Sequence, residues 1–82
     1  MTKKDYEAIA KVIEDQTAVA AELRELGEFT MGVAKHQTAC DIARDLAAIF
    51  EADNPRFDRA VFLTACGDGM GAEMARILKE TK

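Results

Sequence analysis

Residues 54–67 read Asn-Pro-Arg-Phe-Asp-Arg-Ala-Val-Phe-Leu-Thr-Ala-Cys-Gly, and this stretch decides the local architecture of the chain. Pro55 fixes its own φ and disfavours a helical conformation for the residue before it, so the preceding helix should end by Asp53. Asp58 is placed to accept hydrogen bonds from the first free N–H groups of a new helix, as an N-cap. Gly67 can adopt the left-handed conformation that ends a helix. The stretch therefore predicts a helix stop, a turn and a short helix.

Two phenylalanines link this turn to the short helix, which we expect at residues 59–66. With Asp58 as the N-cap, Phe57 and Phe62 occupy the two positions of a hydrophobic staple, which fixes how the chain enters a helix. Further apolar residues follow at helical spacing and extend the buried face. The stretch contains no arrangement of side chains that a reaction mechanism requires.

The same stretch resembles the C-terminal signature of very small proteins encoded by bacteriophages and prophages, which reads roughly Asn-Pro-Arg-Phe-Asp-Arg-x-x-Phe-Leu-x-Ala-Cys-Gly. The opening of the chain, MTKKDYEAIA at residues 1–10, also looks similar to theirs. The resemblance implies a small helical phage accessory protein in the host cytoplasm, and it brings no catalytic residues with it. The two matches cover less than a third of the chain, which departs from the pattern by continuing beyond Gly67.

Composition bounds the fold class. The chain has 82 residues, of which 49% are hydrophobic but only 6% aromatic, with no Trp and one Pro. This size is typical of one domain, residues 1–82, and the apolar fraction is too high for a disordered chain. Abundant alanine favours closely packed helices. We expect an all-α bundle.

Charge and hydropathy narrow the class of partner. The net charge is −4, which argues against electrostatic attachment to nucleic acid. No apolar run approaches the roughly 20 residues that span a bilayer, and the N-terminus lacks a signal-peptide pattern. These features predict a cytoplasmic protein without a membrane partner. Cys40 and Cys66 are expected to be free thiols in that compartment.

The first long helix should begin at Thr2, whose side chain can form a capping box with Asp5, and it should end at Gly27. A polar group around Gln16 makes a bend there the main alternative to one continuous helix. The expected apolar face follows helical spacing. It consists of Tyr6, Ile9, Ile13, Ala20 and Leu23, widened by Val12, Val19 and Leu26.

The second long helix is expected from about Thr30, as its N-cap, to about Ala52. Its expected inward face consists of Ala39, Ile42, Ala43, Leu46, Ile49 and Phe50. The extension beyond Gly67 reads as a further helix from about Met70. We therefore expect two long antiparallel helices with a short two-helix hairpin packed across them.

The apolar stripe of the last helix has the best claim to function. It consists of Met70, Met74, Ile77 and Leu78. Such a stripe could dock into a groove on another protein, and methionine adapts well to irregular surfaces. The alternative is that these residues close the protein's own small core. Exchange of the helix between two copies, giving a homodimer, would combine both interpretations.

Catalytic and metal sites find little support. His36 and Cys40 lie four residues apart on one helical face, a legitimate spacing for two metal ligands, but zinc needs further ligands. The alternative is a histidine that lines the bundle or a dimer seam. Cys66 lies at a helix C-terminus, where the dipole raises a thiol pKa and disfavours a nucleophile. We expect no enzymatic activity and no cofactor.

We predict that the protein works by protein–protein binding, with Arg56, Arg59 and the last helix's apolar stripe as candidate contact residues. In the setting implied by the phage resemblance, the partner is a host or phage protein, and the effect is modulation or inhibition of a host machine, including a defence system. One rival is a small nucleic-acid-associated regulator that gathers Arg44, Arg56 and Arg59 on one face. A metal-binding module using His36 and Cys40 is the other.

Overall fold

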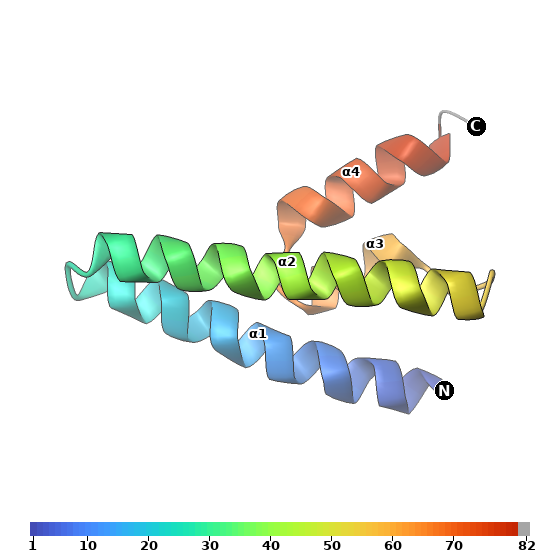
Figure 1. The fold of residues 1–82 in the computed structure, drawn as a ribbon, viewed down its shortest axis with the longest axis horizontal. Coiled ribbons are helices and arrows are strands. Elements are labelled where there is room, and N and C mark those ends of the chain that lie inside the picture. Colours follow the sequence, from blue (N-terminus) through green and yellow to red (C-terminus); the bar gives the residue numbers. More distant parts are fainter. Residues whose placement is uncertain (81–82) are drawn as a thin grey trace.

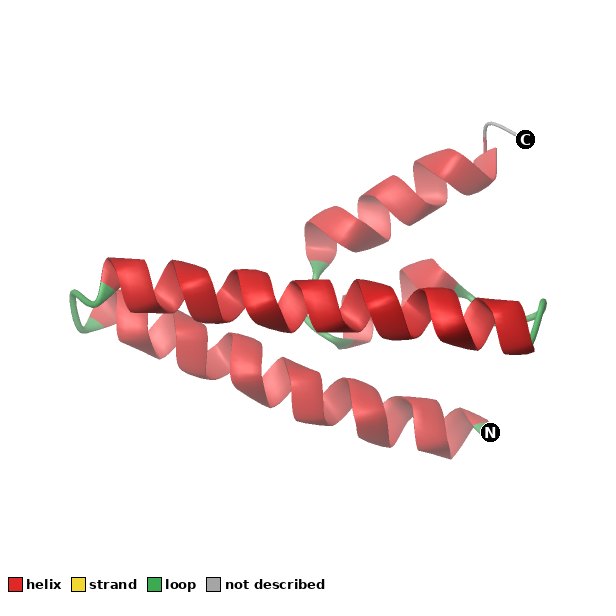
Figure 2. Cartoon of the chain, in the orientation of Figure 1, coloured by secondary structure: helices red, strands yellow, loops and turns green. Residues whose placement is uncertain are grey.

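The computed structural model describes residues 1–80, which form four α-helices and no β-strand. The helices are α1 (Lys3–Glu25), α2 (Phe29–Asp53), α3 (Arg59–Ala65) and α4 (Gly69–Glu80). Short loops join them (Figure 2). The long helices α1 and α2 form an antiparallel hairpin, α3 packs on one face of it, and α4 leaves at an angle (Figure 1). The expected all-α bundle of two long helices and a shorter pair is confirmed.

Helix α1 begins and ends as its sequence predicts. The Thr2 backbone N–H donates to the Asp5 carboxylate at 2.8 Å, and the Asp5 backbone N–H donates to the Thr2 hydroxyl at 3.3 Å. This reciprocal pair is a capping box. Gly27 has φ +87°, and the next N–H, of Glu28, donates to the Leu23 carbonyl at 2.8 Å, which closes a Schellman motif. The helix runs through Gln16 without a break.

Helix α2 begins earlier than the sequence suggested, and the prediction of Thr30 as its N-cap was wrong. The N-cap is Glu28, whose side chain makes no capping hydrogen bond. The chain turns directly after α1, because Gly32 in the first turn of α2 packs against α1. A methyl added at Gly32 would lie 2.9 Å from the Ala20 carbonyl oxygen. Close contact between the helices, rather than a capping side chain, therefore sets the start of α2.

The stretch between α2 and α4 folds as predicted. Asn54 is extended, with φ −139° and ψ 102°, and ends α2 directly after Asp53. Asp58 caps α3 by accepting a hydrogen bond from the backbone N–H of Val61 at 3.2 Å. Gly67 has φ +88° and terminates α3. The predicted end of α2 and the predicted start and end of α3 are therefore confirmed.

Four aromatic rings close one end of the hairpin. Tyr6 of α1, Phe50 of α2, Phe57 of the turn and Phe62 of α3 meet with ring centroids 4.8–5.5 Å apart. Phe57 and Phe62, the predicted staple pair, are both buried and lie 5.5 Å apart. Tilted and edge-to-face pairs of this kind contribute about 0.5–1.5 kcal/mol each beyond their buried area. We call these four residues the aromatic cluster.

Elsewhere the core is built from small side chains. Half of the buried hydrophobic residues are alanines, among them Ala20, Ala43 and Ala47. Apart from Ile13 and Leu63, most of the other large apolar residues lie on the outside. The predicted inward positions of Ile42 and Ile49 were wrong, since both are exposed. The residues expected to widen the apolar face of α1, Val12, Val19 and Leu26, are exposed as well. Helices that touch through alanine and glycine approach closely and leave no room for branched side chains between them.

Candidate interaction surface

Helix α4 is attached to the hairpin at a short junction, residues 66–68, that contacts both α1 and α2. The Thr17 hydroxyl of α1 donates to the Cys66 carbonyl at 3.4 Å. A methyl added at Gly67 would approach the Thr17 hydroxyl to 2.6 Å, so glycine is required both for its positive φ and for this close approach. The junction fixes where α4 starts.

Asp68 is the buried charge at this junction, with only 2% of its surface exposed. Arg44 of α2 donates to both of its carboxylate oxygens, from Nε at 2.7 Å and from a terminal nitrogen at 2.9 Å. The Gly71 backbone N–H also donates to Asp68, at 3.0 Å, which makes Asp68 the N-cap of α4. One carboxylate therefore joins α2 to the first turn of α4.

The charge on Asp68 is stabilised despite its burial. Desolvation alone would raise the pKa of this carboxyl, but the hydrogen bonds from Arg44 and from the Gly71 N–H outweigh it, and the pKa lies below its ordinary value. Bidentate arginine–carboxylate pairs are strong and geometrically specific. The guanidinium of Arg44 is directed into the junction.

Gly71 makes room for this pair. A methyl added at this position would overlap the Asp68 carboxylate and would lie 2.9 Å from the Arg44 Nε. Gly69, two residues earlier, has nothing within 4 Å of the same methyl. Packing therefore requires glycine at position 71 but not at position 69. This turn is the capped start of α4.

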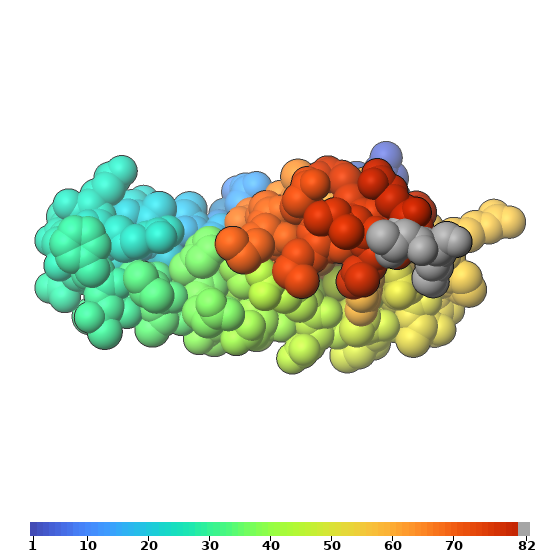
Figure 3. Space-filling view, turned by 90° about the horizontal axis from the view of Figure 1, so that it is seen from above, coloured from blue at the N-terminus to red at the C-terminus, as the bar shows by residue number. Residues whose placement is uncertain are grey.

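The apolar stripe of α4 is exposed. Gly71 and Ala72 pack inward, whereas the four large residues Met70, Met74, Ile77 and Leu78 keep between 50% and 74% of their surface accessible. The alternative that these residues close the protein's own core is therefore wrong. In the space-filling view from above, α4 lies on the side of the molecule nearest to the viewer (Figure 3). Exposed stripes of this composition are typical of protein contact sites.

A hollow of about 190 Å³ lies beside the stripe, between α4, α2 and α3. Met74 and Leu78 form its outer side, and Arg44 of α2 and Arg59 of α3 line it from the other side. Arg59 lies 3.6 Å from Glu51. The surface around α4 thus combines apolar side chains with two guanidinium groups that acidic residues already neutralise in part.

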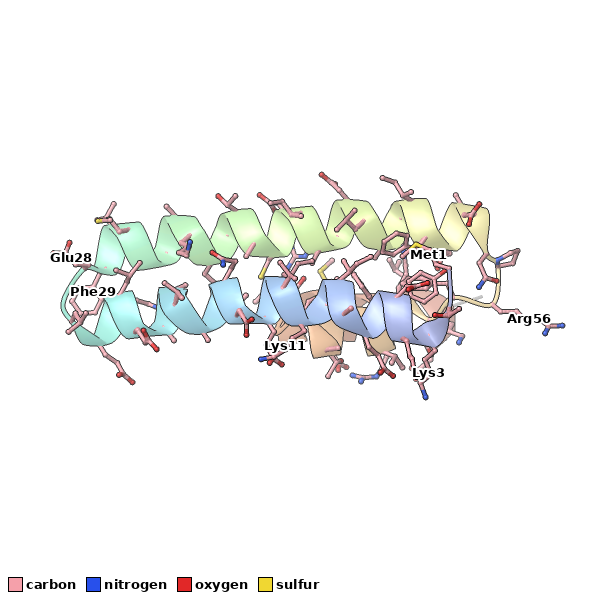
Figure 4. All side chains as sticks on the ribbon, turned by 90° about the horizontal axis from the view of Figure 1, so that it is seen from below. Met1, Lys3, Lys11, Glu28, Phe29 and Arg56 are labelled. Atoms are coloured by element: carbon pink, nitrogen blue, oxygen red, sulfur yellow. The ribbon has the colours of Figure 1, made fainter. Side chains whose placement is uncertain are left out.

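Arg56 lies elsewhere. It projects from the turn after α2, at the far end of the hairpin (Figure 4), and lines a different groove of about 390 Å³ beside the aromatic cluster. Of the three arginines in the nucleic-acid hypothesis, the structure brings Arg44 and Arg59 together and leaves Arg56 apart. The predicted contact residues therefore fall into two groups.

The cysteines and the histidine lie near the junction. The His36 Nε2 atom is 3.5 Å from the Cys40 sulfur, and both thiols are free and buried. Burial raises the pKa of Cys40 and raises that of Cys66 to about 12, so neither is a thiolate at neutral pH. Within residues 1–80 there is no group of three or more His, Cys, Asp or Glu side chains that could hold a metal ion.

No family model, curated protein or solved structure matches the chain. Over the same described residues, no helix is both long enough and apolar enough to cross a membrane.

Sequence reasoning found the stripe of α4 but missed the ion pair that holds the helix in place. Asp68 directly follows the glycine that ends α3 and lies three residues before Gly71, the N-cap spacing. The role of Asp68 as the N-cap of α4 could therefore have been predicted from the sequence. Its partner could not, because Arg44 is 24 residues away in sequence and shares no pattern with it.

Proposed function

We propose that the protein acts by binding another protein through the exposed stripe of α4. The observation that carries this proposal is the orientation of the helix: its glycine and alanine pack inward, while Met70, Met74, Ile77 and Leu78 face outward. An amphipathic helix that presents residues at i, i+4, i+7 and i+8 fits a hydrophobic groove on a partner. No enzymatic step is part of the proposal.

The chemistry of the surface suggests what the groove should offer. Two methionines make the stripe adaptable, so it tolerates an irregular apolar surface. Arg76, beside the stripe, lies 3.2 Å from Glu73 on the exposed side of the helix. A partner with an apolar groove and a polar rim of mixed charge would match both features. The phage resemblance makes a host protein, including one of a defence system, the class to search first.

The proposal is tested by a comparison of two variants in pull-downs from phage-infected host cells. Met74→Asp introduces a charge in the centre of the stripe, whereas Val61→Asp introduces the same charge on the exposed side of α3. Proteins retained by the wild type and by Val61→Asp, but lost with Met74→Asp, are partners of the stripe. Each is then purified, and its affinity is measured calorimetrically.

The result that would contradict the proposal is equally concrete. If all three proteins retain the same host proteins, and circular dichroism shows that all are folded, the stripe of α4 is not the binding surface. Retention of nucleic acid with steep loss at higher salt would instead favour the regulator hypothesis based on Arg44, Arg56 and Arg59.

A further inference from the structure

The α1–α2 hairpin has two faces, and α3 covers only one of them. On the covered face, Ala10 and Thr17 of α1 contact the α3 region: Ala10 lines a groove together with Phe62, and Thr17 bonds to the Cys66 carbonyl. Ala47 of α2 lines the hollow between α2, α3 and α4. Figure 4 shows the same arrangement, with α1 and α2 side by side and α3 behind them.

The opposite face carries large apolar residues. Val12 and Val19 follow Ala10 and Thr17 by two positions, and Ile42 and Ile49 follow Cys40 and Ala47 by two. Two residues are about 200° around an α-helix, so all four point away from α3. Val12 is 64% exposed and Ile49 is 61% exposed. We call this surface the open face: Val12, Val19, Met31, Ile42 and Ile49, edged by half-buried Ile9, Leu23 and Leu46.

The open face is large enough for a stable interface. Two helices of more than twenty residues present an area on the order of 35 by 20 Å, or about 700 Å², from standard helix dimensions. A typical specific interface buries about 800 Å² per partner. The molecule is also thin, with Cα extents of 41 × 28 × 14 Å. Its radius of gyration of 13.3 Å exceeds the roughly 12 Å expected for a compact domain of this length.

The spacing along α2 identifies the occupant. Six positions of its open-face stripe are Met31, Lys35, Thr38, Ile42, Asp45 and Ile49, spaced 4, 3, 4, 3 and 4 residues apart. This heptad pattern is symmetrical about residue 40, so an antiparallel copy of the same helix places Met31 opposite Ile49 and Lys35 opposite Asp45. Met31 and Ile49 then meet as apolar pairs at the two ends, Ile42 lies opposite Thr38 near the centre, and the two Lys35–Asp45 pairs bring opposite charges together.

Helix α1 offers one apolar pair about the same axis. In the hairpin, Tyr6 lies beside Phe50 and Ala20 lies beside Gly32, so residue 40 of α2 is level with residue 14 of α1. An axis at that level places Ile9 of one copy opposite Val19 of the other. Since both helices are matched by one two-fold rotation, we propose that the open face binds a second copy of this chain and forms an antiparallel four-helix core.

The main test is the mass of the protein in solution. Sedimentation should show a species of twice the 9.0 kDa monomer mass that dissociates on dilution. Ile42→Asp should weaken association by at least about 100-fold, because each dimer must then desolvate two carboxylates. Ala48→Asp, the same change on a different side of α2, should leave association unchanged. A wild-type protein that is still monomeric at roughly several hundred micromolar would overturn the proposal. A folded Ile42→Asp variant that still dimerises would also overturn it.

The second test addresses the pairing itself and uses variants that leave the apolar residues intact. Lys35→Glu and Asp45→Lys should each weaken self-association several-fold, because each change puts like charges opposite one another at two places. An equimolar mixture should form a heterodimer of wild-type affinity, because the introduced glutamate then faces the introduced lysine. If the two variants associate no better together than alone, the antiparallel register is wrong.

This inference is independent of the proposed function, because the open face and α4 lie on opposite sides of the hairpin. Met74→Asp should abolish partner binding through α4 and leave the dimer mass unchanged. Ile42→Asp should reduce the mass to that of the monomer while leaving α4 folded and able to bind its partner. The failure of one proposal can therefore be recognised without the failure of the other.

Discussion

The aromatic cluster and α4 show two ways in which this chain treats its large apolar residues. At the aromatic cluster, rings contributed by α1, α2, the turn and α3 are turned toward one another and lie in contact. Along α4, only glycine and alanine face inward, and the large residues face solvent. The first region is held by apolar contact among four segments, and the second by contact with α3 and one ion pair at its start. The aromatic cluster therefore supplies packing that stabilises the fold, and α4 supplies exposed apolar surface.

The largest expected effect tests the aromatic side of this comparison. Phe62→Ala should lower the free energy of unfolding by about 3–5 kcal/mol, because it removes two ring contacts and leaves a cavity. Phe57→Ala should act similarly. Urea unfolding followed by circular dichroism measures both. Unchanged midpoints would show that the cluster does not hold the fold together.

The next effect concerns the attachment of α4. Gly71→Ala should destabilise the protein by about 2–3 kcal/mol, because the added methyl overlaps Asp68 and displaces a buried, charge-assisted hydrogen-bond network. Gly69→Ala is the matched control and should stabilise by about 0.4–1 kcal/mol, since that site is open and alanine restricts the unfolded chain. Equal effects of the two substitutions would contradict the role assigned to the junction.

A smaller effect depends on pH. The folded-state pKa of Asp68 is depressed, so its contribution to stability is present above the unfolded-state value of about 3.9 and is lost as the pH falls through the lower folded value. Asp68→Asn removes this contribution at neutral pH. The difference in urea midpoint between the wild type and Asp68→Asn should therefore narrow on acidification below about pH 4. A constant difference would mean that the carboxylate is not the stabilising group.

The smallest effect is expected on the stripe itself. Met74→Ser should change the free energy of unfolding by no more than about 0.5 kcal/mol, because the side chain is mostly exposed. Thermal unfolding measures it. A loss as large as that of Phe62→Ala would show that the stripe is part of the core after all.

The parts of the fold that were predictable depend on residues close together in sequence. Thr2 with Asp5, Asp58 as a cap, and the glycines at 27 and 67 all act within one helical turn, so their pattern was sufficient. The staple pair was predictable for the same reason.

The parts that were not predictable depend on which of two apolar faces is used. Helix α2 has alanines on one face and isoleucines on the neighbouring face. Hydrophobicity alone predicted that the isoleucines would be buried in the core. The close approach of α1 and α2 at Ala20 and Gly32 selects the small side instead. The ion pair of Asp68 with Arg44 was missed because it joins distant segments without a periodic signal.

The position of the junction has a consequence for how the protein can vary. Helix α4 is anchored in its first turn, and its residues from Arg76 to Glu80 are exposed, although Leu78 also lines the hollow beside α2 and α3. Substitutions at the exposed positions of this segment should therefore leave the α1–α2 hairpin and the aromatic cluster intact, so this end of α4 can be altered or replaced by grafting without rebuilding the scaffold.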